Sequence, residues 1–230
     1  MVNQKEWESE VRKIYRKIKS HKKSYTIIID RISVVIFPNV FSPKYFTDSV
    51  WFARILPEIV KKKNLLEIGT GTGIVALFAA LGGAKITATD INADATANAA
   101  YNFKKHKIPV KTFTGDMYTP LPKNSRFDFI FWNHPFNRGE NCKENILLKS
   151  GFDFHYESLE KYISGAHLHL KPRGKLLLGT GNFATLSEIK RIVSRNNYAM
   201  RLLRRTKLPL SEGSKISNEY HIYRLFRLGR

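Results

Sequence analysis

Residues 64–73, NLLEIGTGTG, form a short apolar run that ends in three glycines separated by threonines. An apolar run of this length that stops at glycines is typical of a buried strand. The next ten residues, IVALFAALGG, predict a helix that ends at Gly82 and Gly83. Glycines between a strand and a helix let the backbone approach a ligand, and the first N–H groups of the helix are free to bind it. The stretch therefore predicts a ligand-binding strand–turn–helix unit.

The downstream sequence continues this alternation of strands and helices. We predict strands at 85–90, 110–116, 127–133 and 175–182, helices at 93–107, 157–174 and 185–198, and two final strands at 200–208 and 219–228. Strands that alternate with helices imply right-handed crossovers and a mostly parallel sheet, so the fold class is α/β. In such a sheet the ligand lies beyond the carboxyl ends of the strands, and these ends are where functional residues are expected.

The upstream sequence predicts an extension in front of this domain. Residues 4–20 predict an amphipathic helix whose apolar stripe docks on the domain. Two β-rich runs, 24–30 and 32–43, predict a hairpin, and a helix capped by Asp48 or Ser49 is expected at 48–63. We therefore divide the chain into a basic helix and hairpin, residues 1–45, and a main domain, residues 46–230.

The composition limits the compartment and the partners. The single cysteine, Cys142, excludes an internal disulfide and fits the cytosol, where we expect it to be an inert thiol. The charged N-terminus lacks the apolar core of a signal peptide, and no apolar run is long enough for a bilayer, so no membrane partner is expected.

Positive charge is the compositional outlier. The net charge is +20. Residues 1–24 contain eight basic and three acidic residues, a net charge of +5, and residues 186–230 contain eleven basic and three acidic residues, a net charge of +8. Such charge attracts polyanions, although a basic surface can also exist without a partner. Nucleic acid is therefore the expected partner.

Two strand ends carry acidic residues suited to a nucleoside. Asp90 can accept hydrogen bonds from two ribose hydroxyls, and Asp116 can accept one from an adenine amino group. The dinucleotide pattern G-x-G-x-x-G fits poorly, because Ile74 takes the position of its third glycine. A nucleoside-bearing cofactor is expected. His167 and His169 do not form a metal pair with completing ligands, so no metal is expected.

The ordered segments LLEIGTGTGIVAL, TATDIN, FTGDM and NHPF resemble the class I S-adenosylmethionine (SAM) methyltransferases over residues 34–185. More narrowly, they are similar to the "methyltransferase small" group, which carries an Asn-Pro-Pro-Tyr/Phe motif. This resemblance implies a Rossmann-like, seven-stranded, mostly parallel sheet with an antiparallel last strand and helices on both faces. It also implies SAM as cofactor. The cofactor residues that it implies are Glu67, Gly69, Thr70, Gly71, Gly73, Asp90, Ile91, Asp116, Met117, Asn133, Thr47 and Ser49.

The tetrapeptide Asn133, His134, Pro135, Phe136 is the predicted catalytic motif. The lone pair of an aryl amine or amide nitrogen is delocalised, so methylation requires that lone pair to be localised and aimed. The Asn133 side-chain oxygen and the His134 backbone carbonyl can both accept from the NH₂ group and stabilise its growing positive charge. Pro135 stiffens the loop, and Phe136 offers a face for stacking, with Phe41 as a second substrate residue.

His134 departs from the group's pattern, in which proline is usual at this position. A backbone carbonyl survives that change, but an imidazole could instead act as a base near neutral pH. Both roles are left open by the sequence.

The leading interpretation is an N-methyltransferase acting on an exocyclic amine of adenine or guanine, in rRNA or tRNA before DNA. A protein glutamine N5-methyltransferase is the first alternative. The related enzymes of that class add a longer helical domain in front and an Arg-Pro-Glu-Thr-like segment, where this chain has SPKYFTDS at 42–49. The second alternative, a SAM-binding RNA-associated factor without catalysis, is disfavoured by the intact Asn133 and Pro135.

Overall fold

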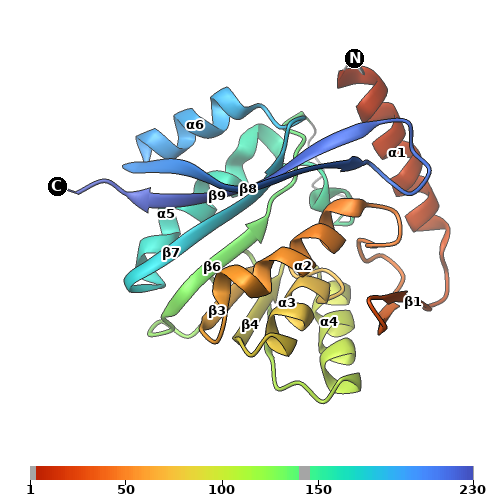
Figure 1. Cartoon of the computed structure of the whole chain (residues 1–230), viewed down its shortest axis with the longest axis horizontal. Helices are drawn as coiled ribbons and strands as arrows, with labels where there is room; N and C mark the ends of the chain where they lie inside the picture. The colour runs from red at the N-terminus through yellow and green to blue at the C-terminus, as the bar shows by residue number, and fades with distance from the viewer. Residues whose placement is uncertain (1–3, 140–145, 230) are drawn as a thin grey trace.

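The computed structural model describes residues 4–139 and 146–229, and Cys142 lies outside them. A seven-stranded sheet in the order β5-β4-β3-β6-β7-β9-β8 forms the centre (Figure 1). Its strands are β3 (Asn64–Ile68), β4 (Lys85–Asp90), β5 (Lys111–Thr114), β6 (Phe127–Asn133), β7 (Leu170–Gly181), β8 (Tyr198–Pro209) and β9 (Ser217–Arg227). The strands β5, β4, β3, β6 and β7 pair in parallel, and β9 pairs antiparallel with both β7 and β8. The predicted Rossmann-like α/β fold with an antiparallel last strand is confirmed.

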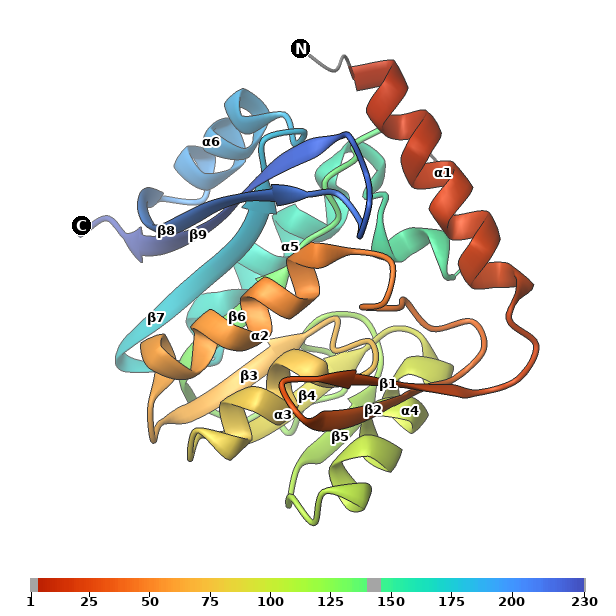
Figure 2. The same cartoon turned by 45° about the vertical axis from the view of Figure 1, so that its right-hand side comes forward.

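Helices cover both faces of the sheet (Figures 1 and 2). One face carries α2 (Thr47–Val60), α3 (Ile74–Leu81) and α4 (Ala93–Lys105), and the other carries α5 (Glu157–Gly165) and α6 (Leu186–Arg195). Because both faces are covered, β3 and β6 are buried along nearly their whole length, which explains why their sequences are mostly apolar and do not alternate.

The N-terminal segment packs on this body. The helix α1 (Gln4–Ser20) buries Trp7, Val11, Ile14, Tyr15 and Ile18, and these join the main hydrophobic core. The indole N–H of Trp7 donates to Asn218 Oδ1 at 3.0 Å, near the turn between β8 and β9, which lies beside α1 in Figure 1. The strands β1 (Tyr25–Ile29) and β2 (Ile32–Ile36) form the predicted antiparallel hairpin, although the second strand is shorter than its β-rich run.

Two predicted element boundaries are wrong. Neither Asp48 nor Ser49 caps α2, because the helix begins at Thr47 after Phe46, whose side chain makes no cap hydrogen bond. The segment Leu170–Gly174, predicted as the end of a helix, already belongs to β7. The register shift between Phe127 and Phe129 and the positive φ of Arg173 show that this start of β7 is bulged, which accommodates Pro172 inside a strand.

Among residues 4–139 and 146–229, no helix combines the length and the apolar character needed to cross a bilayer. No three His, Cys, Asp or Glu side chains gather as a metal site in the same ranges.

Candidate active site

Two cavities meet at the carboxyl end of β6. The larger has a volume of about 300 Å³ and is lined by the glycine turn after β3, the ends of β4 and β6, and the segments around residues 115–117 and 146–161. The smaller, about 40 Å³, lies under α1 and is rich in aromatic rings. Asn133, Pro135 and Phe41 line both cavities, so the predicted catalytic motif stands at their junction.

The glycine turn forms one wall of the larger cavity. Gly71 has a φ of +56°, which favours glycine, and its N–H donates to Asp90 Oδ2 at 2.9 Å. A Cβ added at Gly71 would meet no atom within 4 Å, so this part of the turn borders open space. The geometry matches the expectation that the glycines let a ligand approach the backbone.

Two acids lie behind the turn, Glu67 buried and Asp90 partly buried. Asp90 accepts from the backbone N–H of Asn92 at 2.9 Å as well as from Gly71, and burial raises its pKa against these hydrogen bonds. Glu67 accepts from the Thr70 hydroxyl at 2.6 Å, and burial raises its pKa to about 8. A cationic ligand in this cavity would favour the charged form of both acids.

The larger cavity suits the cofactor that the sequence implies. Each Asp90 oxygen retains a lone pair for a hydroxyl group, and Ile91 and Met117 supply apolar surface. Asp116 also lines this cavity, but its carboxylate pairs with Lys161 Nζ at 2.6 Å. Any contact of Asp116 with an adenine amino group therefore has to share the carboxylate with this lysine.

Asn133 is held by a buried carboxylate. Its Nδ2 donates to Asp48 Oδ2 at 2.8 Å, and Asp48 Oδ1 accepts from the Ser49 N–H at 2.6 Å. Asp48 is almost fully buried, and that burial raises its pKa. The other end of the amide, Asn133 Oδ1, is also buried and has no hydrogen-bond partner among the described residues. A buried acceptor without a donor is costly, which marks this oxygen as the place for a ligand N–H.

His134 turns its ring into the protein interior. Its Nε2 lies 2.8 Å from Thr180 Oγ1, and the ring packs edge-on against Phe136 and Tyr156. Burial lowers the pKa of His134 to about 3, so the imidazole is neutral throughout the physiological range. An imidazole with this pKa is too weak a base to take a proton from the substrate near neutral pH. Of the two roles for His134, the structure therefore favours the backbone carbonyl as a hydrogen-bond acceptor.

Of the remaining predicted residues, some line one cavity, and Thr47 and Gly73 line neither. Ser49 lines the larger cavity, whereas Phe136 lines only the smaller one. Phe41 stacks on Phe46 with ring centroids 4.8 Å apart. Thr47 lines neither, since its hydroxyl donates to the Pro209 carbonyl at 2.5 Å, and the structure does not bring it to the cofactor cavity.

Sequence reasoning missed part of the site. The smaller cavity is closed by Trp7, Val11 and Tyr15 of α1, and by Asn218 and Tyr220 of β9. The apolar stripe of residues 4–20 indicated that the helix docks, but nothing local indicates where. The sequence suggests Asp48 as a helix cap, whereas its partner in the structure, Asn133, lies 85 positions further along the chain.

Comparisons with known proteins agree with this architecture. The family described as "methyltransferase small domain" matches residues 31–200. A putative protein N5-glutamine methyltransferase of Methanocaldococcus jannaschii is 29% identical over 195 residues, which cover 81% of this chain and 94% of that protein. A ribosomal RNA small subunit methyltransferase C of Mannheimia succiniciproducens is 27% identical over 160 residues, covering 67% of this chain and 43% of that protein. The chain therefore spans less than half the length of that second relative.

Solved structures show the same fold. The 16S rRNA N2 G1207 methyltransferase of T. thermophilus, solved with AdoMet and guanosine, superposes with a TM-score of 0.63 at 18% identity, covering 89% of this chain and 50% of that chain. The ribosomal protein L11 methylase of Lactobacillus delbrueckii subsp. bulgaricus gives a TM-score of 0.57 at 18% identity, covering 79% of each chain. By its family match, its fold and the cavity at its glycine turn, the chain belongs to the methyltransferase small domain family and is a methyltransferase that uses SAM.

Proposed function

We propose that this enzyme methylates the exocyclic NH₂ group of an adenine or guanine base in RNA, with rRNA and tRNA as the first substrates to test, ahead of DNA. The observation that carries the proposal is the unpartnered Asn133 Oδ1 at the junction of the two cavities. An NH₂ group offers two N–H donors, one for Asn133 Oδ1 and one for the His134 carbonyl, whereas a hydroxyl nucleophile offers one donor and a ring carbon offers none.

Bound SAM supplies a methyl group made electrophilic by its positively charged sulfur. Glu67, the glycine turn and Asp90 would hold the cofactor in the larger cavity. The chain's task is then to orient the acceptor nitrogen. Asn133 Oδ1 and the His134 carbonyl accept its two N–H groups, which directs the lone pair away from the ring and stabilises the positive charge that develops on nitrogen. The product cation then loses a proton to water, so no strong base is required.

Asp48 positions Asn133 for this role. A carboxylate only accepts hydrogen bonds, so it fixes which end of the amide faces it and leaves Oδ1 directed elsewhere. A hydrogen bond to a charged partner is also stronger than a neutral one. The ionised form of Asp48 is therefore the active form, and its raised pKa brings its titration closer to neutral pH.

Charge supports a nucleic-acid substrate. The net charge of +20 draws a polyanion, and aromatic rings surround the smaller cavity where a planar base would enter. The second candidate is a protein glutamine side chain, whose amide also presents an NH₂ group. That candidate is favoured by one observation, the match along 94% of the M. jannaschii protein whose name states this activity.

The test uses purified enzyme, SAM with a tritiated methyl group, and an extract of cells that lack the enzyme, separated into RNA, DNA and protein fractions. We expect label in RNA, and nuclease digestion should release it as an N-methylated purine. Label in protein alone, recovered as N5-methylglutamine, would replace the first candidate by the second. Label on a ribose oxygen or a ring carbon would contradict the role given to Asn133 Oδ1.

A further inference from the structure

The edge strand β8 and its neighbour β9 carry basic residues that form no ion pair with an acidic residue among the described residues. Arg201, Arg204, Arg205 and Lys207 occupy β8 without a single acid between Tyr198 and Pro209, and Arg224 lies on β9. No ion pair of these residues exists within the described part of the chain. We propose that the face bearing Arg201, Arg204 and Arg224, the arginine face, binds the phosphate backbone of a single-stranded RNA segment and leads it to the cavity beside Asn133. This inference rests on the proposed function.

The register of the two strands places these three arginines on one face. Arg201 lies directly opposite Arg224, and Arg204 lies directly opposite Ile222. Opposed residues of an antiparallel pair point to the same face, and so do residues two apart on one strand. Since Ile222 and Arg224 are two apart on β9, all three arginines share a face in spite of the bulge between Leu202 and Arg204.

The pairing of Arg201 with Arg224 is unfavourable for the isolated protein. Like charges directly opposite each other destabilise a sheet. Arg224 is half-buried, and its Nε is buried without a hydrogen-bond partner among the described residues. A phosphate bound between the two guanidinium groups would supply the missing countercharge.

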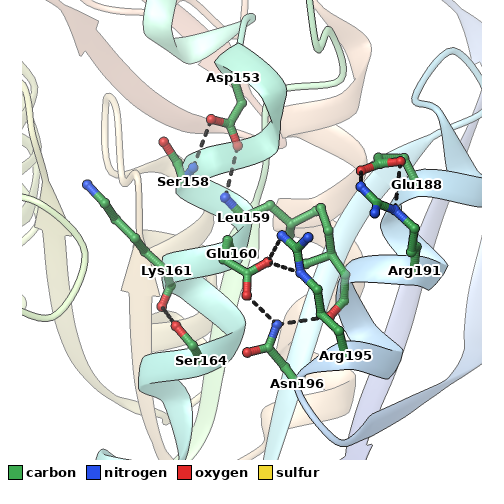
Figure 3. A network of polar contacts seen from close by, with 11 residues as sticks. Asp153, Ser158, Leu159, Glu160, Lys161, Ser164, Glu188, Arg191, Arg195 and Asn196 are labelled. Atoms are coloured by element: carbon green, nitrogen blue, oxygen red, sulfur yellow. Dashed lines mark hydrogen bonds and ion pairs between the residues drawn. The ribbon is translucent and has the colours of Figure 1, made fainter.

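Other arginines of the same protein are neutralised, as Figure 3 shows for α5 and α6. Arg191 pairs with Glu188 at 2.5 Å, and Arg195 pairs with Glu160. The arginines of α6 therefore have acidic partners, whereas those of the arginine face have none among the described residues. Protection of an exposed edge strand could account for charges on β8, but not for Arg224, because β9 is an inner strand.

The arginine face lies on the same side of the sheet as residues that line the smaller cavity. Asn218 and Tyr220 line that cavity, and alternation along β9 puts them on the same face as Ile222 and Arg224. Tyr220 and Arg224 are four positions apart along the strand, which corresponds to roughly 13 Å. Phe226, 40% exposed, extends the same face beyond Arg224 and offers a ring on which a base can stack. Ile222, Tyr220 and Asn218 are themselves buried, so an RNA strand held at the arginine face would approach the smaller cavity from this end of the sheet without running over these residues.

The test compares two charge-matched double variants in RNA binding. Arg201→Gln/Arg204→Gln removes two charges from the arginine face, and Arg191→Gln/Arg195→Gln removes two paired charges from α6 on the other face of the sheet. Affinity for a fluorescently labelled single-stranded RNA is measured by anisotropy over a salt series. Two lost phosphate contacts reduce the steepness of the log–log salt dependence by about 1.4, so across a roughly fourfold rise in salt the first variant should lose about sevenfold less affinity than the wild type.

The control variant should keep the wild-type salt dependence, and unfolding curves should show that both variants are still cooperatively folded, because all four arginines are exposed. An equal change in both double variants would show that net charge alone binds RNA and would overturn the arginine face. Binding of an acidic peptide in place of RNA, abolished by Arg201→Gln/Arg204→Gln, would also overturn it. The anisotropy experiment measures RNA binding and does not depend on methyl transfer. Its outcomes are therefore separate from those of the tritium experiment, in which label found only in protein would contradict the proposed function whatever the RNA affinity.

Discussion

The two cavities that meet at Asn133 are built in opposite ways. The larger one is formed mainly by strand ends and the turns that follow them, and its key groups, the glycine turn and Asp90, lie within 22 residues of one another, at 69–90. The smaller one combines α1, the segment before α2, the 133–137 loop and the β8–β9 turn, which span positions 7 to 220. The groups that bind the cofactor are therefore specified locally in the sequence, while the acceptor side depends on packing between segments far apart in the chain.

Asn133→Ala should have the largest effect, and it separates the two cavities functionally. Losing a preorganised group that matters most in the transition state lowers the rate by about 10²–10³, by analogy with oxyanion donors. SAM affinity should change little, because the cofactor is held by the opposite wall of the larger cavity. Single-turnover methyl transfer and calorimetric SAM titration measure the two quantities. Full activity in the folded variant would break the assignment of Asn133 Oδ1 to the acceptor amine.

Asp90→Ala tests the larger cavity alone. The variant loses a charge-assisted acceptor worth about 1.5–3 kcal/mol, which weakens SAM binding by roughly 10- to 150-fold. Asp94→Ala is the matched control, since Asp94 is exposed, carries the same charge and does not line the cavity. Equal SAM affinity in wild type and Asp90→Ala, measured by calorimetry, would remove Asp90 from the cofactor site.

His134→Gln distinguishes a structural imidazole from a base. The folded-state pKa of His134 is lowered to about 3, below the usual value near 6.5, so its contribution to stability is present above pH 6.5 and is lost as pH falls. Between pH 7 and pH 5 the free energy of unfolding of the wild type should therefore fall by about 2 kcal/mol more than that of His134→Gln. Urea denaturation at the two pH values measures this difference. Parallel losses in both proteins would indicate a solvated, titratable ring.

Asp48→Asn should give the smallest effect and sharpens the description of the acceptor side. The difference between a charged and a neutral hydrogen bond is about 1 kcal/mol, so the rate at high pH should fall by about fivefold. Because the pKa of Asp48 is raised and its ionised form is active, the wild-type rate should rise with pH through that pKa. The variant should lack this rise. A retained acidic limb in the pH–rate profile of Asp48→Asn would assign the titration to another group.

The sequence predictions are more accurate for the larger cavity than for the smaller one. The strand–glycine–helix order was predictable, because hydrophobic periodicity and the residue preferences of turns are local properties of the sequence. The acids at strand ends were predictable because parallel strands bring their carboxyl ends to one edge of the sheet. Asp48 looked like a helix cap because a polar residue at a helix start usually is one, yet its carboxylate turns to Asn133. Lys161 beside Asp116, and the ring of His134 turned toward Thr180, are likewise tertiary contacts that no local pattern encodes.

The hydrogen bond from Trp7 to Asn218 has a consequence for biosynthesis. The two residues are 211 positions apart, so α1 cannot settle over the acceptor cavity until β9 has left the ribosome. At typical elongation rates of about 5–20 residues per second, this interval is roughly 10–40 s. During that time the glycine turn and the first strands can already be folded, whereas the wall that shapes the acceptor site is still absent. A nascent chain would therefore be able to bind cofactor before it could select a substrate.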